Sequence, residues 1–207
     1  MGTTRKLDLP QRIRRSRSWS SFAAAPGQVG GGVPAVLEFL EGSVTEWTTT
    51  ELIDWIQRHL VSPGLMKRPM VLREPGARPL RLDMRMETDA SFEELLLRAR
   101  GRVIEAVRGL IAPVSDDRFL HAAIYGGRVR RASVDGKAAW VPSPREIDFL
   151  GDMVLSVLAS AVLTDRDYYR AHLGLCELCG TVTFRDAADT RAQCAEHRVS
   201  GFTLRAR

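Results

Sequence analysis

Apolar and polar residues follow two different periods along this chain, and the first clear period is helical. Apolar side chains recur at Leu52, Ile53, Trp55, Ile56 and Leu60. This spacing places them on one side of a helix. Thr48, with Glu51 three residues later, is the signature of a capping box. The segment therefore predicts an amphipathic helix that begins after Thr48.

Other stretches predict strands. Between residues 80 and 87, apolar positions alternate with charged ones, which is typical of a strand with one buried face. Residues 70–73 are predicted to form a second strand that lies beside this one. Residues 119–125 and 129–134 also predict strands. Asp135-Gly136 then favours a tight hairpin turn into a strand at 138–141.

The longest apolar stretch of the chain predicts a central helix. Ser143 suits the N-cap position, Pro144 the first helical position, and Glu146 the third. Residues 147–163 are almost entirely apolar, so we expect them to lie in the core. A shorter helix is predicted over 165–173. Helices and strands in this order favour an α+β fold with antiparallel strands packed against helices.

Composition divides the chain into three parts. Residues 1–32 are rich in serine and glycine, and their charges sum to +5, from six basic residues and one acidic residue, whereas the other 175 residues carry 24 of each sign. We therefore predict a disordered basic tail over 1–32, an α+β domain over 33–173, and a metal-binding module over 174–207. Arg12, Arg14, Arg15 and Arg17 are the candidate partner-binding residues of the tail. They could bind a phosphate backbone, an acidic protein or an anionic membrane, and the alternative is a solvated tail that keeps the protein soluble.

The three cysteines lie close together near the C-terminus. An odd, clustered set argues against a disulfide framework and favours a reducing, cytoplasmic location. We expect no transmembrane segment, because serines interrupt the longest apolar run, which is too short to span a bilayer. The large excess of arginine over lysine fits a GC-rich bacterial genome.

The cysteine spacing predicts a metal site. Cys176-x2-Cys179 is followed by 14 residues and then by Cys194-x2-His197. Two short pairs on separate turns can close a tetrahedron around one Zn²⁺. Gly180, directly after the first pair, can adopt positive φ and turn backbone N–H groups toward the sulfurs. A redox Cys-x-x-Cys is the alternative, and the second pair makes it weaker.

Residues 174–200 resemble the small zinc modules of the zinc-ribbon or treble-clef class. The resemblance implies that Cys176, Cys179, Cys194 and His197 are the ligands of one structural zinc. His172 could replace His197. We recognise no family in the rest of the chain.

These patterns favour a non-catalytic, zinc-containing binding or adaptor protein that docks a protein or nucleic-acid partner. A Cys3His site uses all four tetrahedral positions for protein ligands, and no catalytic motif is recognisable. The alternative is an enzyme whose site is assembled from scattered residues of the α+β body. His121, near Asp116 and Asp117, would be its starting point. A deep pocket with convergent polar groups around His121 would favour that alternative.

Overall fold

The computed structural model describes residues 32–40, 47–61, 71–81, 90–134, 136–143, 145, 147–185, 192–194 and 197. Its helices are α1 (Gly32–Leu40), α2 (Thr49–Ile56), the π-helical turn η3 (Gln57–Val61), α3 (Ala90–Ile111), α4 (Arg118–Tyr125), α5 (Leu150–Thr164) and α6 (Arg166–His172). Its strands are β1 (Val71–Arg73), β2 (Leu80–Arg81), β3 (Val129–Val134), β4 (Lys137–Pro142), β5 (Ile147–Phe149), β6 (Leu173–Leu175) and β7 (Val182–Phe184). This composition confirms the α+β class.

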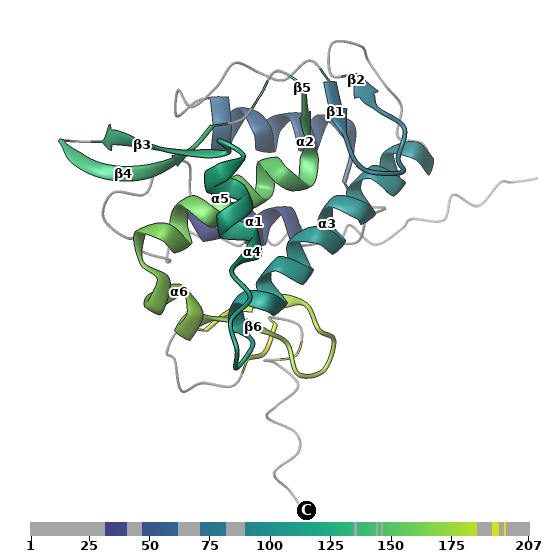
Figure 1. The fold of residues 1–207 in the computed structure, drawn as a ribbon. Coiled ribbons are helices and arrows are strands. Elements are labelled where there is room, and N and C mark those ends of the chain that lie inside the picture. The colour runs from purple at the N-terminus through teal and green to yellow at the C-terminus, as the bar shows by residue number, and fades with distance from the viewer. Residues whose placement is uncertain are drawn as a thin grey trace, which may run out of the picture.

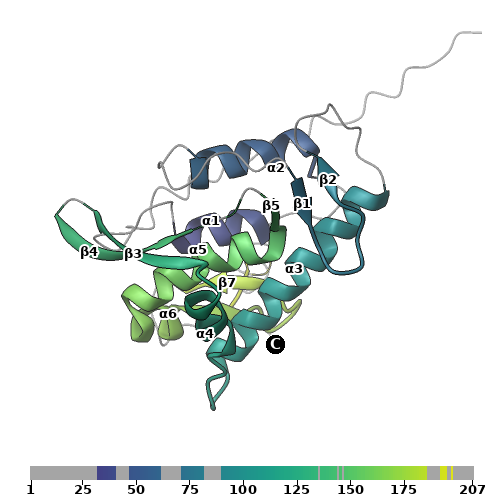
Figure 2. The same cartoon turned by 45° about the horizontal axis from the view of Figure 1, so that its top comes forward.

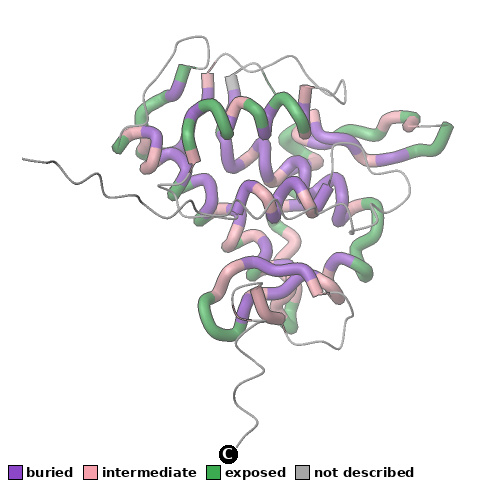
Figure 3. Tube along the Cα trace, turned by 180° about the vertical axis from the view of Figure 1, so that it is seen from behind, coloured by how far each residue is buried: buried purple, intermediate pink, exposed green. Residues whose placement is uncertain are grey.

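Helix α5 is the centre of the molecule (Figure 1). Helices α1, α3, α4 and α6 pack against it, and so do β4 and β5. Its side chains are buried on nearly every side, because it is apolar around most of its circumference. Figure 3 shows that the buried positions gather in the interior of the molecule. No helix in the described part of the chain is long and apolar enough to cross a membrane.

The strands form three small sheets. Strands β2, β1 and β5 make the first, and the pairs β3–β4 and β6–β7 make the other two. The predicted hairpin at Asp135-Gly136 is confirmed, with Val134 opposite Lys137 and Gly136 at φ 76°. Its ribbon extends outward from the body in Figures 1 and 2. Most pairs are antiparallel, as predicted, but β1 and β5 run parallel.

The capping box that begins α2 is also confirmed. The Glu51 N–H donates to Thr48 Oγ1 at 3.2 Å, and the Thr48 N–H donates back to Glu51 Oε2 at 2.6 Å. Helix α2 then buries Trp55, whose indole N–H donates to the Ala35 carbonyl in α1 at 2.9 Å. Local sequence therefore determines where this helix begins, and its apolar face determines where it packs.

Two predicted elements are wrong. Residues 119–125 form helix α4, because Leu120 and Ala123, three positions apart, turn together toward the core on α5. The central helix does not begin after Ser143. It begins at Leu150, because residues 147–149 extend as β5 and pair with the edge of β1. Pro144 and Glu146 of the predicted cap lie outside the described residues, as do residues 82–89 of the predicted 80–87 strand.

A row of alternating charges joins α3, α5 and β5 with the residue that follows β1 and the residue that precedes β3. It runs from Glu74 through Arg102, Asp152 and Arg128 to Asp148, and we call it the acid–arginine network. Glu74 Oε2 lies 3.0 Å from Arg102 Nη1, and Asp152 Oδ2 lies 2.9 Å from Arg128 Nη2. Arg102 also pairs with Asp152, and Arg128 with Asp148. The end carboxylates are fully buried. The network therefore joins segments that are distant in the sequence.

Candidate metal centre

The first half of the site is a short turn between β6 and β7. Strand β6 follows α6 directly and leads into Cys176, and β7 returns antiparallel to β6, with Leu175 opposite Val182. Inside the turn, the Gly180 N–H donates to the Cys176 carbonyl at 2.8 Å. Gly180 has φ 70°, as the sequence predicts. This backbone turn brings Cys176 and Cys179 to one side.

The second half lies against the first through backbone contacts. The Glu177 N–H donates to the Ala192 carbonyl at 3.1 Å, and Thr183 Oγ1 donates to the Gln193 carbonyl at 3.1 Å. Gly174 in β6 permits this approach, because a Cβ there would lie 2.9 Å from the Ala192 Cβ. Cys194 and His197 follow on a single turn, closed by the His197 N–H to the Cys194 carbonyl at 3.1 Å.

The four side chains meet as one cluster. The sulfurs of Cys176, Cys179 and Cys194 and a ring nitrogen of His197 all lie within 4.8 Å of one another. Cys179 Sγ is 3.7 Å from Cys194 Sγ, and His197 Nδ1 is 3.1 Å from Cys194 Sγ and 3.4 Å from Cys176 Sγ. Two sulfurs bound to zinc at tetrahedral angles would lie about 3.8 Å apart, from Zn–S bonds of about 2.3 Å. The cluster can therefore hold one metal ion.

Backbone N–H groups favour the thiolate form of Cys176. Burial raises the pKa of the Cys176 thiol, but N–H groups of Cys194, Leu178 and Cys179 directed at its sulfur lower that pKa to about 6. Thiolates, not thiols, ligate metals. All three cysteines are free of disulfides. Cys176 is buried and Cys179 is exposed, so the site lies at the surface with one ligand anchored inside.

His172 does not join the cluster. Its Nδ1 lies 2.8 Å from the Tyr168 carbonyl, one turn earlier in α6. Its ring stacks on Tyr168 at 4.2 Å and on Phe184 at 5.4 Å between centroids. The structure therefore brings His197, and not His172, to the three cysteines.

The remaining sequence candidates are four arginines of the tail and His121. Arg12, Arg14, Arg15 and Arg17 lie outside the described residues. His121 is exposed on α4, with its ring 6.4 Å from that of Tyr125. It does not line the cavity that adjoins α4. The enzyme alternative, which started from His121, therefore gains no support from the position of this residue.

Sequence reasoning missed a second concentration of polar groups. The acid–arginine network borders a cavity between α3, α4 and α5, and Arg102, Arg128 and Asp152 line it. One signal was available in the sequence, namely an acidic residue, Glu74, directly after a predicted strand. That signal did not reveal its partners, which lie 28 and 77 residues away.

Comparison of the chain with protein-family models, with curated proteins and with solved structures found no match. Geometry and chemistry alone therefore support the functional assignment.

Proposed function

We propose that this protein is a non-catalytic binding protein whose C-terminal segment is held by one structural zinc ion. The observation that carries the proposal is the convergence of three sulfurs and one imidazole nitrogen within 4.8 Å. Cys176, Cys179, Cys194 and His197 would supply the four ligands.

The donor set favours zinc over other common divalent ions. Calcium and magnesium prefer oxygen ligands, whereas thiolates with one imidazole suit zinc in a tetrahedral site. Four protein ligands leave no open position for water or substrate. A metal held in this way supplies folding free energy and no catalysis. The expected role of the ion is therefore to fix the two turns against each other.

An exposed apolar side chain supports a protein as the partner. Leu178 lies between the two ligands of the first pair and is 67% exposed. Because Cys176 and Cys179 would be tied to the metal, the backbone that carries Leu178 would be rigid. A rigid apolar side chain at the tip of a turn can enter a partner's pocket at little entropic cost.

The metal is tested by elemental analysis of full-length protein purified under reducing conditions. We expect about one zinc per chain in wild-type protein. His197→Ala should weaken metal retention, and His172→Ala, the matched control, should leave it unchanged. Replacement by Co²⁺ should give the visible absorption of a tetrahedral ion with thiolate ligands. Wild-type protein that carries no zinc would refute the assignment.

The partner is tested by crosslinking and capture from the source cells, using zinc-loaded protein. Leu178→Ser should reduce capture of a specific protein, whereas Leu97→Ser on α3, where the leucine is 57% exposed, should not. A chain that lacks residues 1–32 should still capture that protein. If removal of 1–32 abolishes capture while Leu178→Ser leaves it intact, the basic tail makes the contact and docking through the metal-bound turn is wrong.

Nucleic acid binding is a separate prediction for the tail. If it occurs, four to six tail contacts with phosphates would give a log–log salt slope of about −4 to −5 on duplex DNA. Removal of residues 1–32 should flatten that slope. Binding of a defined sequence that is equally tight without the tail would contradict the charge argument.

A further inference from the structure

A cavity of about 610 Å³ lies between α3 and α4, over α5. Both helices pack on α5, and four of the eight lining residues that they contribute are small. Ala106 and Gly109 contribute from α3, and Ala122 and Ala123 from α4. Because these side chains cannot fill the space between the two helices, a cavity remains. Its volume lies within the range of about 300–1,000 Å³ that is typical of small-ligand sites.

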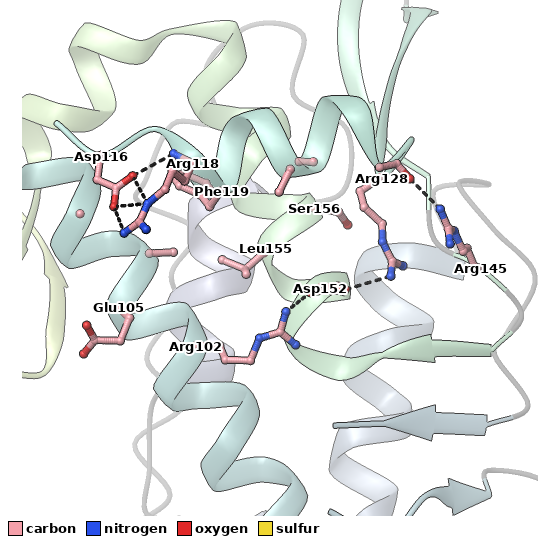
Figure 4. A pocket seen from close by; sticks show the side chains of 15 residues that line it. Arg102, Glu105, Asp116, Arg118, Phe119, Arg128, Arg145, Asp152, Leu155 and Ser156 are labelled. Carbon is pink, nitrogen blue, oxygen red and sulfur yellow. Dashed lines mark hydrogen bonds and ion pairs between the residues drawn. The ribbon is translucent and has the colours of Figure 1, made fainter. Parts of the chain in front are cut away.

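The middle of this cavity is apolar. Phe119 from α4 and Leu155 from α5 line it together with the alanines. Both Phe119 and Leu155 are only partly buried. We call the surface formed by Ala106, Phe119, Ala122 and Leu155 the apolar strip. Figure 4 shows Leu155 between two polar ends, with Asp116 and Arg118 at one and Arg128 and Arg145 at the other.

Most of the cavity's charges are already compensated. Arg102 and Arg128 belong to the acid–arginine network and pair with its carboxylates. Arg118 donates to both carboxylate oxygens of Asp116, at 2.9 and 2.8 Å from its Nε, and these bonds hold the pKa of the Asp116 carboxyl below its usual value. Such closed pairs have little attraction left for a ligand.

Arg145 differs from these arginines. Its Nη2 donates to the Gly126 carbonyl at 2.6 Å, which holds the guanidinium at the cavity edge. No carboxylate among the described residues lies within ion-pair distance of it. Asp148 accepts from the Arg145 backbone N–H at 3.0 Å, but Asp148 is buried and directs its other oxygen to Arg128 and to the Phe149 N–H. Among the described residues, therefore, no carboxylate neutralises the Arg145 guanidinium, which lies at one end of the apolar strip.

We propose that this cavity binds a small amphiphilic anion. The apolar body of the ligand would lie on the strip, and its single carboxylate or sulfonate would accept hydrogen bonds from Arg145. An ionised acceptor on a guanidinium forms stronger hydrogen bonds than a neutral one, and the fork of N–H groups fixes its orientation. The site lies apart from the metal cluster, so it is independent of the function proposed above.

Two probes with the same rings and different charge test the proposal. Anilinonaphthalene sulfonate carries one anionic group, and N-phenyl-1-naphthylamine carries none. Both fluoresce more strongly in apolar surroundings. We expect full-length wild-type protein to bind the sulfonate more tightly than the amine, and decanoate to displace both.

The variants separate charge from shape. Arg145→Gln should weaken binding of the sulfonate by about tenfold, which is the effect of losing one charge-assisted hydrogen bond. It should leave the affinity for the amine unchanged. Arg145→Lys should retain most of the affinity. Ala122→Leu, at an exposed position of α4, should weaken binding of both probes, because the larger side chain would occupy the space over the apolar strip. Arg130→Gln on β3 removes an exposed arginine that does not line the cavity and should affect neither.

Near-UV circular dichroism of each variant confirms that tertiary packing is intact, because loosely packed proteins also bind the sulfonate. Equal affinity of wild-type protein for the two probes would overturn the proposal. So would unchanged sulfonate affinity in Arg145→Gln, or unchanged affinity of both probes in Ala122→Leu.

Discussion

Replacement of Glu74 by glutamine isolates the charge at one end of the acid–arginine network. The Glu74 side chain is fully buried, with Oε2 3.0 Å from Arg102 Nη1. Its Oε1 accepts the Gly151 N–H in the first turn of α5. A carboxylate at that position also interacts favourably with the positive end of the helix dipole. Glutamine retains the size and one acceptor oxygen, but it removes the negative charge.

The contacts of Glu74 determine how much free energy of unfolding the substitution should remove. Hydrogen bonds to charged groups contribute about 1.5–3 kcal/mol each. The Arg102 side chain is 36% exposed, so water screens part of this interaction, and we expect Glu74→Gln to cost about 1.5–2 kcal/mol. Glu74→Ala should cost roughly 3–5 kcal/mol, because it also leaves the Gly151 N–H buried without its acceptor.

Urea denaturation followed by tryptophan fluorescence measures these losses, since Trp55 is buried in the core. Glu94→Gln is the matched control. It removes a carboxylate that pairs with Arg98 one turn away, where the side chains are 46% and 45% exposed. Such surface pairs contribute about 0.3–0.5 kcal/mol. If Glu74→Gln costs no more than Glu94→Gln, the buried network does not stabilise the fold and the reasoning is wrong.

Three further predictions concern other parts of the chain. Asp165→Ala should cost about 1 kcal/mol, because it removes the side-chain cap of α6, while Asp167→Ala in the same first turn should cost less in a denaturation series. The hydrogen bond from His59, opposed by burial, lowers the pKa of the Glu38 carboxyl below 4.5, so this contact should stabilise the fold above that pH and lose its effect as the pH falls further. Wild-type stability should therefore decline in acid more steeply than that of Glu38→Gln. Removal of metal by a chelator should release the two metal-binding turns while far-UV circular dichroism of the body persists, and simultaneous loss of all structure would show that both parts fold as one unit.

The chelation experiment also tests whether the metal-binding segment is separate from the main core. Leu173, Val182 and Phe184, which belong to β6 and β7, lie in the same core as the helices. Strand β6 also packs against α3. The predicted boundary between residues 173 and 174 stays a prediction, and the chelation experiment tests it directly.

The sequence by itself determined the features that depend on neighbouring residues. The capping box at Thr48, the hairpin at Asp135-Gly136 and each of the two short ligand pairs involve partners a few residues apart, whose geometry follows from short-range stereochemistry. The apolar stretch also identified the buried helix, because a helix that is apolar on most sides must lie inside.

Only the tertiary structure decided the features that depend on distant partners. Residues 147–149 have no local reason to extend, and they do so because the edge of β1 offers hydrogen bonds. Helix α4 likewise depends on its packing against α5. The network joins residues 20 to 50 positions apart, and the cavity lies where small residues of two separate helices face each other over a third. Neither charge pairing nor unfilled volume has a period along the chain, so no local pattern could indicate them.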